Sequence, residues 1–391
     1  MSSSRVIILR EDIYSKFDHD RYGIDIFRER GISVEYWDCS KIFRAKFQGD
    51  EKPISSDGFS GVRCFQKKKS LLKSISHLTS QDTVIPAISY NIKTLGVFRH
   101  ISNTKASWGI PRLGDLPIPK EEISFQGRVE KIIRRPSTVI NFLLKKFPPS
   151  VLGLRPLDFI LQGGTATLAG PIAILKGKKT KILDAHAMDY DRFLLSKNDI
   201  DEYEGPEYVV FLDSSNPFHR DHDIFRVRFP CPFETYFSNL NRLFGEIEEQ
   251  FNCSVVVASH PRVQYEKREN PFEGRKLIQG KTNTLVKYSK FVISTCSTAV
   301  NFPVIYKKPI IFLSIKPEKR NHWDNMTRNF ASYLGKLPID MGAEKEIDWE
   351  QELIVNKDAY NQYMEEYIKK RGSPEKPCWE ILADHLKSIA V

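Results

Sequence analysis

The sequence lacks the features that mark several protein classes. Its six cysteines, spread over 391 residues, form no CxxC pair, which argues against a zinc ribbon or a disulfide framework and fits a reducing compartment. No apolar run approaches about 20 residues, the length that spans a bilayer, and the N-terminus lacks the apolar segment of a signal peptide. We therefore expect a cytoplasmic protein.

Glycine is missing where a dinucleotide site would need it. The first apolar run, residues 5–10, is followed by the acidic turn EDIYSKFDHD and not by a GxGxxG motif. The glycines of that motif let the backbone approach a pyrophosphate. Their absence argues against a conventional NAD site.

Positive charge is present in surplus, with a net charge of +10. Such a surplus attracts nucleic acid, an anionic membrane surface or phosphorylated substrates, or it only solvates the surface. No nucleic-acid-binding motif is present, so we expect no nucleic-acid partner. The segment 134–146 mixes cations with apolar side chains. It could rest on anionic lipid headgroups, or it could form a core-facing helix with basic ends.

Short apolar runs alternate with helical patterns along the chain, as in parallel α/β folds. The acidic stretch 196–207, which contains glycine and proline, is typical of a domain linker. We expect an α/β protein of two Rossmann-like domains, residues 1–205 and 206–391, and residues 374–377 would suit a return of the last helix to the first domain. The expected strands are residues 5–10, 32–37, 83–87, 157–161 and 180–183, then 208–212, 254–258, 290–293 and 310–313.

Two polar groups follow expected strands of the second domain, and ligands of open α/β sheets bind at the carboxyl ends of strands. A histidine and an arginine stand in the first group, where they can contact a phosphate, although a turn histidine bonded to backbone is an alternative. The second group is a run of small residues before a helix, whose hydroxyls and free N–H groups form a phosphate cradle. Helix capping explains one of its hydroxyls but not four. The predicted phosphate-binding residues are His260, Pro261, Arg262, Ser294, Thr295, Ser297 and Thr298.

The stretch from His260 to Leu313 resembles the donor domain of bacterial GT-B glycosyltransferases that use CMP-activated acidic sugars. These are the sialyl-, Kdo- and pseudaminic or legionaminic acid transferases of capsule and lipopolysaccharide assembly. In them an HP motif and a Ser/Thr-rich motif hold the CMP phosphate, and His260-Pro261 and Ser294–Thr298 match these motifs. The resemblance, good over residues 208–315, implies a GT-B fold with an interdomain cleft, a CMP-sugar donor and no further cofactor.

Other classes share parts of this pattern. CDP-glycerol and CDP-ribitol polymerases of teichoic acid synthesis also pair an HP with serines, but an Asp-Tyr usually precedes those serines, where this chain has Thr295-Cys296. A UDP-sugar epimerase with two Rossmann-like halves is a third possibility. A scaffold protein of capsule assembly is the non-enzymatic alternative.

Carboxylates follow two expected strands, within residues 184–191 and 213–223. An inverting transferase needs one carboxylate to deprotonate the acceptor hydroxyl, and a retaining one can use it as a nucleophile. His and Asp at this spacing could also bind Zn²⁺ or Mn²⁺, but the resembled enzymes manage without metal, so we expect none. A helix cap or surface ion pair is the alternative role for each carboxylate. Our order of catalytic candidates is Asp189, Asp213, Asp191.

The acceptor side is expected in the first domain. Two glycines after the run 157–161 let backbone approach a ligand, or make a tight turn. The expected acceptor is a surface glycan or glycolipid at the inner membrane, where the enzyme would be peripheral, and the transferred sugar a nonulosonic acid or Kdo. The predicted acceptor or cleft residues are Gly163, Gly164, His186, Asn91 and His219.

Overall fold

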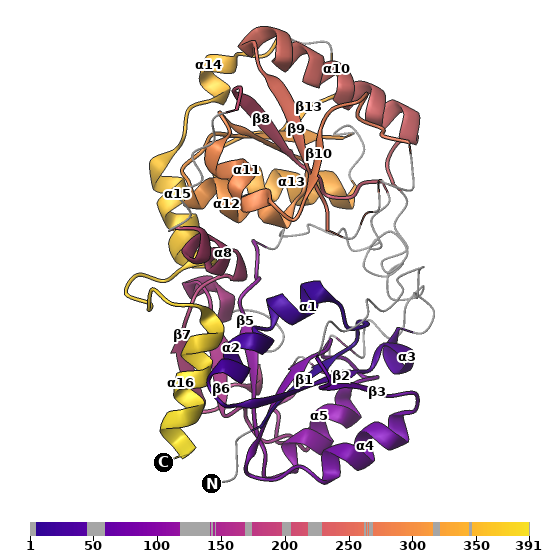
Figure 1. Cartoon of the computed structure of the whole chain (residues 1–391), viewed down its shortest axis with the longest axis vertical. Helices are drawn as coiled ribbons and strands as arrows, with labels where there is room; N and C mark the ends of the chain where they lie inside the picture. The colour runs from indigo at the N-terminus through magenta and orange to yellow at the C-terminus, as the bar shows by residue number, and fades with distance from the viewer. Residues whose placement is uncertain are drawn as a thin grey trace. The chain divides into compact units, whose positions relative to one another are not determined.

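The computed structural model describes residues 5–44, 59–117, 141, 144, 146–168, 174–197, 205–217, 229–261, 263, 265, 269–315, 321–343 and 346–390. Its contacts divide the chain into two compact units (Figure 1). Unit 1 comprises Met1–Gly114, Glu121–Met188 and Gly372–Val391, and unit 2 comprises Asp115–Lys120 and Asp189–Arg371.

The sheet of unit 1 has seven parallel strands in the order β3-β2-β1-β4-β5-β6-β7. Its central strands are almost continuously apolar, because both faces of a parallel sheet are covered by helices. The strands are β1 (Arg5–Arg10), β2 (Ser33–Asp38), β3 (Val62–Cys64), β4 (Asp82–Ala87), β5 (Ser107–Arg112), β6 (Phe159–Gln162) and β7 (Lys181–Asp184).

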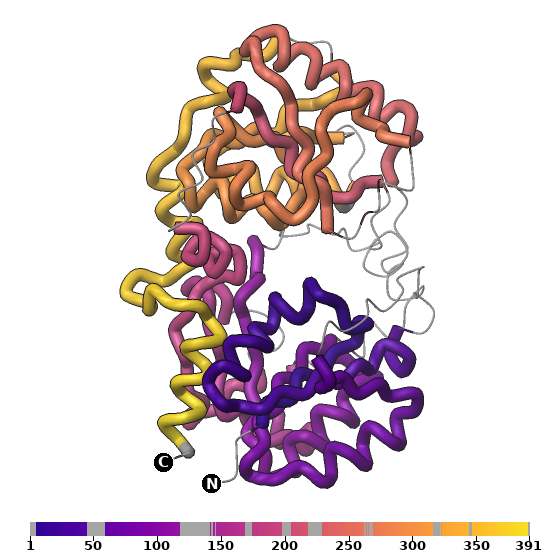
Figure 2. The backbone as a smooth tube through the Cα atoms, in the orientation of Figure 1, coloured from indigo at the N-terminus to yellow at the C-terminus, as the bar shows by residue number. Residues whose placement is uncertain are grey.

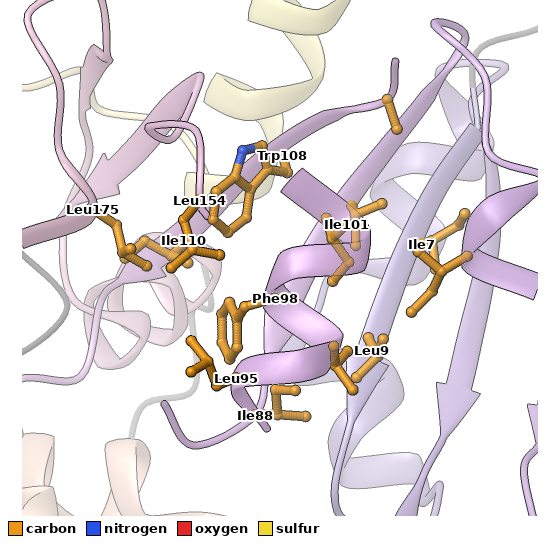
Figure 3. Close-up of a cluster of buried hydrophobic side chains, with 14 of the residues drawn as sticks. Ile7, Leu9, Ile88, Leu95, Phe98, Ile101, Trp108, Ile110, Leu154 and Leu175 are labelled. Carbon is orange, nitrogen blue, oxygen red and sulfur yellow. The ribbon is translucent and has the colours of Figure 1, made fainter. Parts of the chain in front are cut away.

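Two apolar cores lie on the two faces of this sheet. Helices α4 (Lys68–Ser76) and α5 (Leu95–Ser102) cover one face, where Phe98 and Trp108 pack together (Figure 3). The other face is covered by α2 (Ile24–Glu29) and by the C-terminal helix α16 (Cys378–Ala390), the yellow stretch beside α2 in Figure 2. Unit 1 also contains the short helices α1 (Lys16–Arg21), α3 (Ser40–Phe43) and η2 (Thr165–Leu168).

One close contact of α16 on unit 1 involves a glycine. Gly23 has a φ of +56°, and a Cβ at this position would lie 2.5 Å from the side chain of Trp379. The indole Nε1 of Trp379 donates a hydrogen bond to the carbonyl of Arg21, at 2.7 Å. Glycine is needed here for both the left-handed backbone and the approach of the tryptophan.

The sheet of unit 2 has six parallel strands in the order β10-β9-β8-β11-β12-β13. They are β8 (Tyr208–Leu212), β9 (Ser254–Ser259), β10 (Leu277–Gln279), β11 (Val292–Ser294), β12 (Ile310–Ser314) and β13 (Ile339–Asp340). The helices are α8 (Met188–Ser196), α10 (Phe233–Phe251), α11 (Thr282–Tyr288), the 3₁₀ turn η5 (Thr298–Val300), α12 (Asn301–Ile305), α13 (His322–Tyr333), α14 (Trp349–Glu352), α15 (Lys357–Tyr363) and the π-helical turn η6 (Met364–Ile368). No helix in these described ranges is long and apolar enough to cross a membrane.

The units divide at Met188, ahead of the acidic stretch where the sequence predicted a boundary at residue 205. The physical reason is the packing of α8 on unit 2. Phe193 packs edge-on against Tyr306, and Nδ2 of Asn283 donates to Oγ of Ser196 at 2.6 Å. The last helix belongs to unit 1.

Candidate functional site

The carboxyl ends of three adjacent strands, β9, β8 and β11, carry a polar cluster in unit 2. Leu212 pairs with Ala258 on one side and with Ser294 on the other. The residues that follow, Asp213 and Thr295 among them, therefore emerge at one level of the sheet edge. We call the residues 213–216, 259–260 and 294–298 the strand-end cluster.

Asp213 lies at the centre of the hydrogen bonds of this cluster. It is only 4% exposed. Its Oδ1 accepts from the N–H of Ser215 at 2.8 Å, and its Oδ2 accepts from the N–H of His260 at 3.1 Å and the hydroxyl of Tyr265 at 3.0 Å. Burial raises the pKa of Asp213 to about 6, while these hydrogen bonds pull it downward. Both oxygens are engaged within the protein, which favours a positioning role. Its catalytic role stays a prediction.

Both the N–H and the carbonyl of His260 make hydrogen bonds to side chains. Its N–H donates to Asp213, and its carbonyl accepts from Nε2 of Gln279 at 3.0 Å. The next residue, Pro261, is exposed, and the predicted Arg262 lies outside the described residues. The local fold thus fixes the point from which the imidazole leaves the backbone.

The predicted hydroxyls divide into buried and exposed ones. Ser294 and Thr295 are fully buried. Oγ1 of Thr295 shares a hydrogen bond of 2.9 Å with Oγ of Ser214, and Oγ of Ser294 accepts from the N–H of Ser297 at 3.4 Å. These two hydroxyls brace the strand ends.

Ser297 and Thr298 lie further out along the same run. Oγ of Ser297 caps η5 by accepting from the N–H of Ala299 at 3.3 Å. Three of the four predicted hydroxyls, those of Ser294, Thr295 and Ser297, therefore take part in internal hydrogen bonds. Helix capping was expected to occupy only one. Thr298 is exposed, at the first position of η5. It is therefore the hydroxyl most open to a ligand.

Three buried polar atoms at the same sheet edge have no hydrogen-bond partner among the described residues. They are Oδ1 of Asn216, Oγ of Ser259 and Oγ of Ser314. They follow β8 or end β9 and β12, and each residue is at most 5% exposed. An unsatisfied buried polar group costs about 1–3 kcal/mol, which a bound polar ligand recovers. These residues were not predicted as site residues, although Ser-Ser-Asn after Asp213 is a visible polar signal in the sequence.

The backbone after β8 is itself unusual. Ser215 has a φ of +58°, in the left-handed region that a residue with a side chain rarely adopts. Nδ2 of Asn216 donates to Oγ of Ser214 at 3.0 Å, which anchors the turn. Such backbone strain gathers at ligand sites.

The first-ranked carboxylate, Asp189, is oriented by a side chain of another helix. Nδ2 of Asn301, the first residue of α12, donates to Oδ2 of Asp189 at 2.8 Å. Oδ1 of Asn301 accepts from the hydroxyl of Tyr363 at 3.1 Å. Neither Asn301 nor Tyr363 was predicted from the sequence, because no local pattern links residues so far apart. Asp191 lies in the same first turn of α8 and is partly buried.

In unit 1 the predicted glycines make a tight turn. The N–H of Gly163 donates to the carbonyl of Arg112 at 2.9 Å, and a Cβ at Gly163 would lie 3.1 Å from that oxygen. The carbonyl of Gly164 accepts from Nε2 of Gln162 and from Oγ1 of Thr167. These contacts favour the packing alternative over a ligand cradle.

The other predicted acceptor residues also contact backbone. His186 is fully buried, with Nε2 2.9 Å from the carbonyl of Lys376 and Nδ1 3.1 Å from that of Ala187. Oδ1 of Asn91 accepts from the N–H of Lys93 at 2.9 Å, in the turn before α5. Position 219, the predicted histidine, lies outside the described residues.

A charged cluster in unit 1, at the ends of β1 and β4, was not predicted as a site. Glu11 is buried, and its Oε1 accepts from Arg44 at 2.9 Å and from the hydroxyl of Ser89 at 2.7 Å. Arg10 pairs with Asp12 at 2.6 Å. The acidic turn after the first strand was the available signal. Within the described residues no three His, Cys, Asp or Glu side chains converge on a metal position, and the expected independence of metal stays a prediction.

No family model and no curated protein match the sequence. Solved structures do match over the whole chain. S. aureus MnaA, solved with UDP, is 13% identical, with 99% of this chain and 97% of MnaA covered and a TM-score of 0.50. A putative UDP-N-acetylglucosamine 2-epimerase from Listeria monocytogenes is 12% identical, with 100% and 96% covered and a TM-score of 0.49.

The glycosyltransferase SnogD from Streptomyces nogalater is 9% identical, with 100% of both chains covered and a TM-score of 0.46. At these identities the likeness concerns the fold. The α/β prediction of two Rossmann-like parallel sheets with a GT-B fold is confirmed.

Proposed function

We propose that this chain is a GT-B glycosyltransferase that binds a CMP-activated acidic sugar at the strand-end cluster of unit 2. The observation that carries the proposal is the buried Asp213 holding the backbone of His260 beside a hydroxyl-rich strand end. The sequence match to the HP and Ser/Thr-rich motifs supports a phosphate of a cytidine donor as the ligand.

The chemistry of the cluster suits a departing phosphate. The imidazole of His260 and the hydroxyl of Thr298 can donate to phosphate oxygens, and Ser297 retains its own hydroxyl proton for donation. Donors fixed before the reaction stabilise the negative charge that develops on CMP as the sugar leaves. The backbone bonds of Asp213 and Gln279 supply that fixation for His260.

The same proposal assigns Asp189 as the carboxylate that activates the acceptor hydroxyl. Asn301 holds it and follows directly after η5, whose first residue is Thr298. One short helical segment therefore carries a phosphate-binding hydroxyl and the group that orients the base. A general base needs this kind of fixed geometry before its pKa matters.

The acceptor in this proposal is a surface glycan or glycolipid presented at the inner membrane. The segment 134–146, which the sequence analysis considered for lipid contact, lies largely outside the described residues.

Donor turnover separates the proposal from its alternatives. We would incubate the protein with a CMP-activated nonulosonic acid, CMP-Kdo, CDP-glycerol and UDP-N-acetylglucosamine, and follow nucleotide release and sugar isomerisation. Release of CMP from an acidic-sugar donor, lost in His260→Ala, is the expected result. Turnover of CDP-glycerol alone would replace the proposal by a polyol-phosphate transferase. Isomerisation of the UDP-sugar without an acceptor would replace it by an epimerase, the activity in the name of the Listeria protein.

A further inference from the structure

Among the described residues, the helical layer over one face of the unit 1 sheet contains no acidic residue. Residues 66–81, 83–114 and 146–157 include neither Asp nor Glu. They include α4, α5, the strands β4 (apart from Asp82) and β5, and residues 146–157, which we call the strip and which contact α5 through Leu152 and Arg99. In a chain with 49 acidic residues, the absence of acidic side chains from these three stretches leaves positive charge on this surface.

The layer is held together as one surface. Nζ of Lys68 donates to the carbonyl of Lys93 at 2.9 Å, which joins α4 to the turn before α5. Nε of Arg99 donates to the carbonyl of Leu152, which joins α5 to the strip. The inner side chains of the layer, such as Phe98, point into the apolar core (Figure 3).

Several of the exposed side chains of the layer are cations. Lys69 and Lys73 are four residues apart, so they share the face of α4 that is turned away from the buried Leu71 and Ile75. None of the exposed cations of the layer has an ion-pair partner among the described residues. These cations are Lys67, Lys68, Lys69, Lys73, Lys93, Arg99 and Lys105.

Three large apolar side chains in the same residue ranges are also exposed. Ile92 is 41% exposed, Phe147 46% and Val151 67%. The N–H of Ile92 donates to Oδ1 of Asn141 at 2.9 Å, and Ile92 directly precedes Lys93, one of these cations. Val151 directly precedes Leu152, the partner of Arg99. Apolar tips and unpaired cations thus occupy the same surface.

We propose that this surface, the α4–α5 face, docks on an anionic lipid bilayer. Cations without counter-charges attract the negative surface potential of acidic lipids, and apolar tips enter the boundary between headgroups and acyl chains. A soluble polyanion would use the cations but would leave the apolar side chains in water, so the combination favours a membrane. The inference rests on the proposed function, whose acceptor is presented at the inner membrane, and deepens it by naming the surface that meets the bilayer. Vesicle binding needs no nucleotide donor, so its failure is distinguishable from a failure of donor turnover.

Vesicle co-sedimentation of the full chain tests the proposal. Vesicles of phosphatidylcholine alone are compared with vesicles of equal parts phosphatidylcholine and phosphatidylglycerol. The wild type should bind the anionic vesicles, and more weakly as salt is raised. The triple variant Lys67→Gln, Lys69→Gln, Lys73→Gln should bind about 100-fold more weakly, since each lysine near the surface contributes about fivefold.

A matched control removes the same charge elsewhere. Lys281, Lys357 and Lys387 are exposed and lie outside the layer, so their triple change to Gln should leave vesicle binding within about twofold, as expected for a purely local effect. Equal losses in the two triple variants would overturn the proposal, as would equal binding to both kinds of vesicle.

The apolar tips distinguish a bilayer from a soluble polyanion. Ile92→Ser with Val151→Ser should weaken vesicle binding and leave binding of soluble polyphosphate unchanged. Both side chains are exposed, so the changes should not disturb folding, which circular dichroism checks. Vesicle binding that is unaffected by this double variant, together with tight binding of polyphosphate, would overturn the membrane assignment in favour of a soluble polyanion.

Discussion

The pH dependence of Asp213→Asn tests the electrostatics of the strand-end cluster. Burial raises the pKa of Asp213 to about 6 even though three donors contact the carboxylate. The folded protein therefore binds the carboxyl proton of Asp213 more tightly than the unfolded chain does. The resulting stabilisation is present at low pH and is lost as pH rises through about 6. The asparagine variant has no such proton.

The magnitude follows from the pKa of the folded state. At about pH 5, one unit below that pKa, protonation stabilises the wild type by about 1.4 kcal/mol relative to about pH 7.5. The unfolding free energy of the wild type minus that of Asp213→Asn should therefore fall by about 1.4 kcal/mol between these pH values. Urea unfolding followed by tryptophan fluorescence measures it, since Trp323 and Trp349 lie in the same unit as Asp213. A difference in unfolding free energy that stays constant with pH would show that burial does not shift the pKa of Asp213. A difference that grows with pH would show that the hydrogen bonds outweigh burial.

Two further predictions concern positioning and packing. Asn301→Ala removes the hydrogen-bond donor to Asp189. In steady-state assays kcat should fall about tenfold or more, while KM for the sugar nucleotide should stay within about twofold. A changed KM with unchanged kcat would refute the positioning role. Gly23→Ala combines a left-handed φ with a contact at 2.5 Å to Trp379 and should cost about 3 kcal/mol in thermal unfolding. Gly31→Ala also has a positive φ, but no atom lies within 4 Å of its Cβ, and should cost only about 1–2 kcal/mol. Equal losses for the two glycines would contradict the packing argument.

The central strands could be predicted because fully buried parallel strands are continuous apolar runs. The runs at β1, β8, β9 and β12 fall within a residue of their expected ends. The edge strands β3 and β10 have three residues each, too few for a pattern to stand out.

Strand β5 was hidden for another reason. Its sequence SWGIPR contains Gly109 and Pro111, which are depleted in strands. The structure shows why glycine is required there. A Cβ at position 109 would lie 2.5 Å from the ring of Phe159 on the neighbouring strand. A tertiary contact thus explains a residue that local propensity disfavours.

The location of the strand-end cluster could be predicted, but its internal bonding could not. The rule that ligands bind at the carboxyl ends of strands selected Asp213, His260 and the run 294–298. Which hydroxyls face inward depends on the pleat and on partners from other strands, as with Thr295 and Ser214, which are 81 residues apart. For the same reason the sequence selected Asp189 but not the Asn301 that orients it.

Calorimetric titration of the protein with CMP tests most directly whether the strand-end cluster holds a nucleotide phosphate. We expect the wild type to bind CMP. His260→Ala leaves the buried Asp213 intact and should bind CMP about 10- to 100-fold more weakly, the loss expected for a hydrogen bond to a charged group. Absence of CMP binding, or equal binding by wild type and variant, would contradict a phosphate site at the strand-end cluster.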